Sequence, residues 1–133
     1  MVPMSPRRRG RALSISSEEF ENLVRRAVDG LPDQYRHLLK NVAVVVEEEP
    51  SRDVLDELEL ETEDDLLGLY SGPSRDTESF FDPGGQLPAR VSIYRGPILR
   101  LCRTEGEVIQ EVRDTVVHEI GHHFGLEDDD MPY

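Results

Sequence analysis

The longest regular pattern in the sequence covers residues 105–124. Apolar residues recur there every three or four positions, namely Ile109, Val112, Val116 and Ile120. At the pitch of an α-helix this spacing places them on one side, while two histidines lie on another side. The pattern therefore predicts a long helix that buries one face in a core and turns the other face toward a cleft.

That second face carries the motif His118-Glu119-Ile120-Gly121-His122. At about 100° per residue, the two histidines lie about 40° apart around the axis and one turn apart along it. Both imidazoles can therefore bind one cation. Glu119 lies about 100° from His118 and about 60° from His122, near the open side of such a cation. The motif predicts a hydrolytic zinc centre in which Glu119 is the general base for a metal-bound water.

A catalytic zinc ion takes three protein ligands and keeps one position for water, so one further ligand is needed. The eleven residues after His122 leave no room for a later helix with a glutamate ligand, although an upstream residue stays an alternative. The spacing HExxHxxGxxD indicates Asp128 instead, because Gly125 can end the helix and turn the chain back toward the metal. Three neighbouring acids also stay alternatives: Glu127, Asp129 and Asp130. A run of four acidic residues is also typical of a solvated terminus without a metal.

The charge of the chain excludes several classes of partner. The net charge is -13, and four arginines between positions 7 and 11 contribute +4, so the remaining residues carry -17. An acidic body repels phosphate groups and anionic lipid, so we expect neither nucleic acid nor a membrane surface as a partner. Residues 1–14 are expected to be a disordered basic tail, and residues 15–133 a single domain.

Cysteine content and hydropathy indicate the compartment. Cys102 is the only cysteine, which excludes internal disulfides and a multi-cysteine zinc site. The sequence contains no run of about 18 apolar residues, so we expect no membrane span. No apolar segment typical of a secretory signal follows the arginines. We therefore expect a cytoplasmic protein, and a monomer.

Other patterns place shorter elements upstream. They predict helices over 16–29 and 33–40, a strand over 42–46, a short helix after Ser51, a strand over 66–71, a surface loop over 71–87 and a strand over 90–94. The continuous apolar run over 42–46 is interpreted as a central strand. Gly68 inside a strand indicates a bulge, tight packing, or close approach of another backbone such as a substrate. Tyr70 and Tyr94 are candidates to assist catalysis, although packing is the more ordinary role of a strand aromatic.

Three stretches resemble one known family. They are 117–125 (Val-His-Glu-Ile-Gly-His-His-Phe-Gly), 66–72 (Leu-Leu-Gly-Leu-Tyr-Ser-Gly), and Leu-Pro at 87–88 with Ile-Tyr-Arg-Gly-Pro-Ile at 93–98. They are similar to the small bacterial zincin-like metallopeptidases, sometimes called minimal metalloproteases, over about residues 16–131. The resemblance implies a compact zincin-like α+β domain, a small mixed sheet packed with helices, with the HExxH motif on the C-terminal long helix. It also implies Zn²⁺ on His118 and His122, with Glu119 as base.

The sequence departs from better-studied metzincins at two points. Asp128 stands in place of a third histidine, which lowers the charge of the metal-ligand unit and predicts slow catalysis. Met131 follows Asp128 by only three residues, so we do not assign it to a methionine turn. The main hypothesis is hydrolysis of peptide bonds in a peptide or protein substrate. Alternatives are a catalytically weak or inactive zinc-containing module that binds peptides, and hydrolysis of a non-peptide amide.

Overall fold

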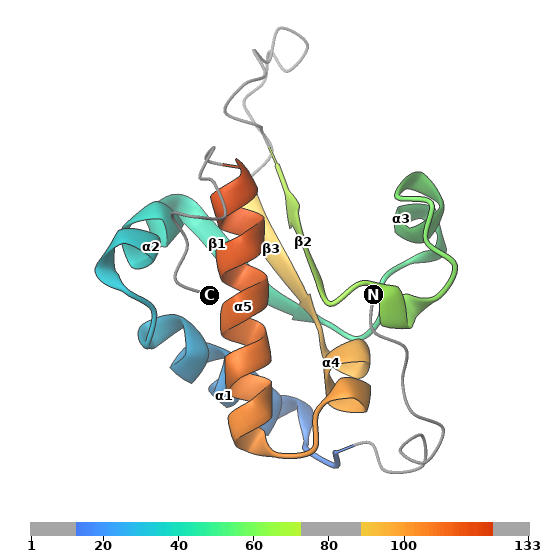
Figure 1. Ribbon diagram of the computed structural model, residues 1–133, viewed down its shortest axis with the longest axis horizontal. Helices are drawn as coiled ribbons and strands as arrows, with labels where there is room; N and C mark the ends of the chain where they lie inside the picture. The colour runs from blue at the N-terminus through green and yellow to red at the C-terminus, as the bar shows by residue number, and fades with distance from the viewer. Residues whose placement is uncertain (1–12, 73–88, 124–133) are drawn as a thin grey trace, which may run out of the picture.

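The computed structural model describes residues 13–72 and 89–123, and of residues 122 and 123 only the helical backbone (Figure 1). The elements in chain order are α1 (Ser17–Asp29), α2 (Asp33–Leu38), the 3-10 turn η2 (Leu39–Asn41), β1 (Val42–Glu47), α3 (Arg52–Glu57), the 3-10 turn η3 (Glu63–Asp65), β2 (Gly68–Ser71), β3 (Ala89–Tyr94), α4 (Arg95–Leu101) and α5 (Glu105–His123). The predicted mixed α+β architecture, a small sheet packed with helices, is confirmed. No helix in these described ranges is long and apolar enough to span a membrane.

The sheet has three strands in the order β1-β3-β2. β1 runs parallel to β3, and β2 runs antiparallel to it, so that Val91 pairs with Val44 on one side and with Tyr70 on the other. The central strand is therefore β3, and the prediction of a central strand over 42–46 is wrong. A continuous apolar run indicates that both faces of a strand are buried, but it does not indicate whether the strand is central or at an edge of the sheet. Here most of β1 is only partly buried.

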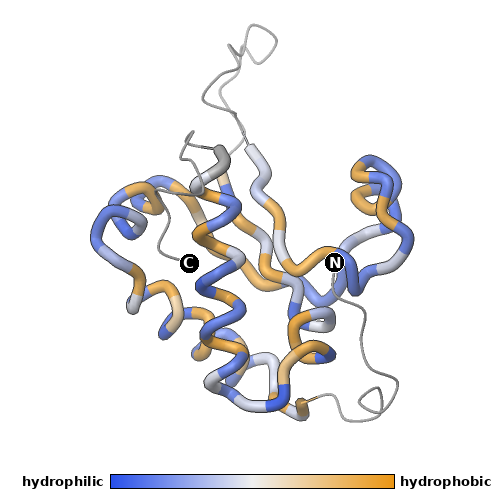
Figure 2. Tube along the Cα trace, viewed as in Figure 1, coloured by the Kyte–Doolittle hydropathy of each residue, from blue (hydrophilic) through white to orange (hydrophobic). Residues whose placement is uncertain are grey.

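The core lies between one face of the sheet and the two longest helices. α5 crosses the sheet from end to end and α1 packs beside it (Figure 1). Val91 and Ile93 of β3 and Val112 and Ile120 of α5 are fully buried there. Hydrophobic positions recur along α5 among hydrophilic ones (Figure 2). The helical periodicity that predicted a core-facing side of this helix is confirmed.

Local signals fix both ends of α1. Ser16 and Glu19 form the predicted capping box: the Ser16 hydroxyl accepts from the Glu19 N–H at 3.1 Å, and the Glu19 carboxylate accepts from the Ser16 N–H at 3.2 Å. At the other end, Nε of Arg113 in α5 donates to the Ala27 carbonyl at 3.2 Å. A Cβ at Gly30 would collide with that guanidinium. The glycine that ends α1 therefore also lets α5 approach it.

Gly68 lies where α5 packs closely against β2. A Cβ at this position would lie 2.5 Å from Cγ2 of Thr115 in α5 and 2.9 Å from the carbonyl oxygen of Ser92 in β3. Real Cβ atoms do not tolerate such distances. Tight packing between helix and strand therefore explains this glycine, and the contact holds the flank of α5 beside β2.

We expect Gly68→Ala to lower the free energy of unfolding by about 1–3 kcal/mol, because the added methyl must displace Thr115 or a strand carbonyl. Removing the opposing methyl with Thr115→Ser should recover part of this loss. Gly106→Ala is the matched control, because only the Thr104 hydroxyl lies near its added Cβ, at 3.8 Å. Urea unfolding of the four proteins measures the effect. Equal stability of Gly68→Ala and the wild type would contradict the packing.

Candidate functional site

The candidate site lies toward the C-terminal end of α5. Its helical backbone continues through residue 123, so positions 118, 119 and 122 fall within its last two turns. Val117 and Ile120 are fully buried, whereas His118 and Glu119 are only partly buried. Core contacts therefore fix the rotation of this turn, and the polar side chains lie at the margin of the core.

A backbone hydrogen bond orients the His118 ring. Its Nδ1 lies 2.8 Å from the carbonyl oxygen of Asp114, one turn earlier in α5. Because a carbonyl oxygen only accepts, Nδ1 must carry the proton, and in the neutral ring the lone pair then belongs to Nε2. Metal-binding histidines are commonly held in this way. His118 is therefore in the tautomer that offers Nε2 to a cation.

Glu119 lies at the outer edge of β2. Its Oε1 accepts from the Tyr70 N–H at 2.8 Å. The Tyr94 N–H donates to the Leu67 carbonyl, which makes these two residues a hydrogen-bonded pair. In an antiparallel ladder such pairs alternate, so the backbone N–H and C=O groups of Gly68 and Tyr70 point away from β3, toward the outer edge of β2. No sequence signal predicted this bond, because its partners are 49 positions apart. It places the motif carboxylate on the sheet edge that carries outward backbone groups.

β2 and the end of α5 run in the same direction. Thr115 adjoins Gly68, and four residues later Glu119 adjoins Tyr70. Four helical residues rise about 6 Å and two strand residues about 6.6 Å, so the two elements stay in step. One flank of α5 therefore follows the outer edge of β2 as far as the candidate site.

Comparison with known proteins identifies the family. Residues 39–133, more than two thirds of the chain, match the profile of the zincin-like metallopeptidases. The chain belongs to that family. The family predicted from the three sequence stretches is thus confirmed. A solved structure of a conserved hypothetical protein from Thermo thermophilus is similar to this zincin-like chain, with 28% identity, a TM-score of 0.53, and coverage of 83% of this chain and 94% of that one. None of the curated proteins compared with this chain matches it.

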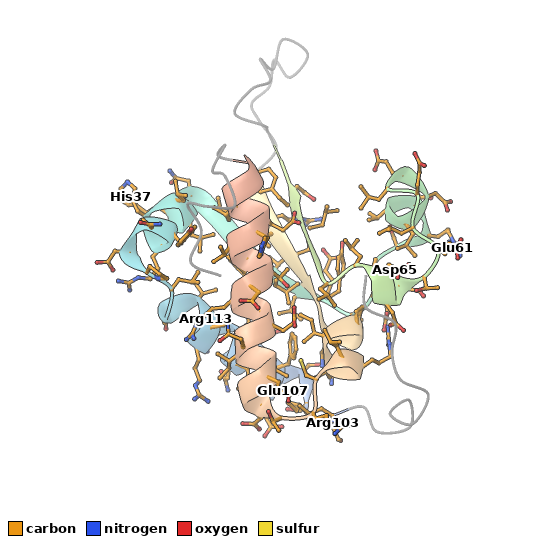
Figure 3. The ribbon with its side chains drawn as sticks, in the orientation of Figure 1. His37, Glu61, Asp65, Arg103, Glu107 and Arg113 are labelled. Atoms are coloured by element: carbon orange, nitrogen blue, oxygen red, sulfur yellow. The ribbon has the colours of Figure 1, made fainter. Side chains whose placement is uncertain are left out.

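Not all the predicted site residues of this zincin-like chain fall within the described ranges. His118 and Glu119 do, and position 122 is described as helical backbone. The remaining candidates and the neighbouring residues of interest lie outside the described residues: the His122 side chain, Gly125, Glu127, Asp128, Asp129, Asp130 and Met131. Within 13–72 and 89–121, side chains form no group of three potential metal ligands. His37 is exposed on α2, on the side that faces away from α5 (Figure 3).

The two candidate tyrosines have packing roles. Tyr70 belongs to the core cluster beneath α5 and is 8% exposed. Tyr94 is 3% exposed and projects from the other face of the sheet, because Ile93 beside it faces α5. Burial, and then the charge of Glu47, raise the pKa of Tyr94. Both rings are therefore part of the scaffold of this zincin-like domain, and the phenol of Tyr94 is also within electrostatic reach of Glu119, whose charge further raises its pKa.

Cys102 and Glu111 lie close to each other, where α4 ends beside α5. Burial, followed by the charges of Glu111 and Glu107, raises the pKa of the Cys102 thiol to about 12, so it is no thiolate ligand at neutral pH. The pKa of Glu111 is also raised, first by burial and then by Asp114, while His118 opposes the shift. Sequence reasoning overlooked Glu111, although its position seven residues before His118 is a helical spacing.

We expect Glu111→Gln to stabilise the protein increasingly as the pH rises from the usual pKa of a glutamate through the raised pKa of Glu111. A carboxyl whose pKa is raised by folding contributes stability below its usual pKa, and that contribution is lost as the pH rises through the raised value. Glutamine imitates the neutral form and keeps the contribution. Thermal melts of both proteins across this range test the expectation, and a melting-temperature difference independent of pH would contradict it.

Proposed function

We propose that this chain is a zinc-dependent peptidase with Glu119 as its general base. The single observation that most supports this is that the Glu119 carboxylate lies at the outward edge of β2, one residue after a histidine held in the metal-binding tautomer. A base, a ligand and a strand edge that can pair with an extended peptide thus adjoin one another. Membership of the zincin-like metallopeptidase family supports the same interpretation.

We assign the zinc ligands to His118, His122 and Asp128. Two imidazoles and one carboxylate are a donor set that catalytic zinc accepts, with one position left open. The backbone bond from His118 to Asp114 fits this assignment, because it directs the other ring nitrogen to a ligand. When bound, zinc supplies Lewis acidity and lowers the pKa of a water molecule.

Glu119 moves protons in this proposal. Its Oε1 accepts from the Tyr70 N–H, which fixes the side chain beside the ligands. A backbone N–H is no base, so it does not compete with Glu119 for protons. We assign proton transfer to the second carboxylate oxygen, which first takes a proton from the attacking water and then gives it to the leaving amine. The bond from β2 thereby positions the base.

We propose that an extended peptide or protein substrate pairs with the outer edge of β2. The outward carbonyls of Gly68 and Tyr70 accept hydrogen bonds in the register that the β2–β3 ladder defines. Strand addition of this kind uses main-chain bonds for affinity and side-chain contacts for selectivity. The substrate strand is taken to run antiparallel to β2, which continues the antiparallel pairing of β2 with β3.

A peptide-library digest tests the proposal. The full chain, loaded with one equivalent of zinc, is incubated with a mixture of unstructured peptides, and the products are sequenced by mass spectrometry. We expect cleavage that a chelator stops and zinc restores. Saturable peptide binding without any cleavage would instead favour a zinc-containing peptide-binding module, and cleavage limited to small amides would favour a non-peptide amidase.

Three further predictions accompany this function. We propose that residues 15–133 form one domain preceded by a basic tail over 1–14, that the protein acts as a monomer, and that it works in the cytoplasm. The acidic body, with -17 outside the arginine segment, supports a peptide or protein partner over nucleic acid or a membrane surface.

A further inference from the structure

Glu111 lies on the flank of α5 that follows β2. Thr115 marks this flank by its approach to Gly68, and Glu111 precedes it by one turn, about 40° away around the axis. Its side chain is partly buried. Within the described residues no hydrogen bond and no ion pair joins its carboxylate to another group, although the charge of His118 acts on it. A partly desolvated, unpaired carboxylate is costly, so a cation supplied from outside would be favourable there.

The arginines near this part of α5 are directed elsewhere, and the positive charge that acts on Glu111 comes from His118 on the same helix. Arg113 lies on the α1 side of the helix, and Arg103 precedes its first turn (Figure 3). Asp114, whose charge acts on Glu111, accepts a hydrogen bond from the Gln110 side chain at 2.9 Å. The carboxylates of Asp114 and Glu107 add negative charge around Glu111 rather than neutralise it.

The direction of the elements defines which part of a substrate would reach Glu111. Since β2 and α5 run the same way, a strand antiparallel to β2 runs from the candidate site back toward the start of α5. Glu111 lies seven residues before His118, about 10 Å along the helix axis. An extended peptide covers that distance in about three residues.

We infer that Glu111 is a specificity subsite that binds a lysine or arginine side chain about three residues on the C-terminal side of the scissile bond. The inference rests on the proposed function and on the antiparallel substrate strand. Ammonium and guanidinium groups provide both the positive charge and the hydrogen-bond donors that this carboxylate lacks. Glu111 makes this contact far from the reacting atoms, so it selects substrates and leaves the proton transfer to Glu119.

The test uses one cleaved peptide resynthesised with lysine, its neutral isostere norleucine, or glutamate at each of the four positions on either side of the cleavage point. We expect lysine at the third C-terminal position to raise kcat/KM over norleucine by about five- to tenfold, the effect of one partly desolvated charge pair. Glu111→Gln should reduce this ratio to near one. Glu105→Gln is the control, because Glu105 lies in the exposed first turn of α5 and should leave the ratio unchanged.

A binding measurement supplies a readout independent of turnover. Fluorescence anisotropy of the same labelled peptides with the Glu119→Gln variant should show the same lysine preference, and Glu119→Gln/Glu111→Gln should lose it. Cleavage without a lysine preference, or with the preference on the N-terminal side, would overturn the inference and leave the proposed function standing. Failure to cleave any peptide would overturn both.

Discussion

Glu119→Gln is expected to lower peptide hydrolysis by about 10²–10⁴-fold, the usual contribution of a positioned general base, while the protein still binds one zinc ion. Glutamine cannot take a proton from water at neutral pH. It keeps an amide oxygen that can accept from the Tyr70 N–H, so the hydrogen bond to β2 is preserved. Loss of activity in this variant would therefore report proton transfer and not a displaced side chain.

The measurement combines initial rates on a cleaved peptide, zinc content after gel filtration, and a thermal melt. Glu119→Asp is the matched variant, because it keeps the carboxylate but withdraws it from β2 by one methylene. We expect it to retain partial activity. Turnover of Glu119→Gln at the wild-type rate would refute the assignment of the base, whatever its metal content.

His118→Ala and His122→Ala are expected to weaken zinc binding by more than about 100-fold each. Losing a ligand should cost at least as much as losing a group that merely orients one, which lowers metal affinity by about 10–100-fold. Zinc affinity is measured by competition with a chromophoric chelator. His37→Ala is the control, because this exposed histidine lies on α2 and should leave affinity unchanged.

The same competition identifies the third ligand. Alanine at Asp128 should reduce zinc affinity, whereas alanine at Glu127, Asp129 or Asp130 should not. An equal, small loss at all four acids would indicate a diffuse electrostatic effect and contradict Asp128 as a ligand. Wild-type affinity in His118→Ala would contradict the metal centre itself.

Features governed by neighbouring residues were predictable from the sequence. The capping box of Ser16 and Glu19 and the buried stripe of α5 depend on hydrogen bonds and spacings within a few positions, and both are confirmed. α4 was overlooked because Gly96 and Pro97 usually signal a turn. In the structure Pro97 lies in the first turn of this short helix, where its missing N–H costs nothing, and a Cβ at Gly96 would collide with Glu49.

Features that depend on long-range packing were not predictable. The run over 42–46 is apolar whether its strand is central or at an edge, and only the order β1-β3-β2 decides between them. Gly68 allowed three interpretations until Thr115 of a distant helix was seen to adjoin it. The Tyr70–Glu119 bond belongs to the same class, because it arises only where α5 meets β2. The HExxH motif thus predicted that Glu119 is a general base, and the fold places its carboxylate at the outer edge of β2.

An anomalous difference map, measured at the zinc absorption edge on crystals of the zinc-loaded full chain, tests the central claim most directly. We expect a single strong peak about 2.0–2.1 Å from Nε2 of both His118 and His122, with Glu119 outside bonding distance and still adjoining β2. A peak at any other group of side chains, or no peak in crystals grown with stoichiometric zinc, would contradict it.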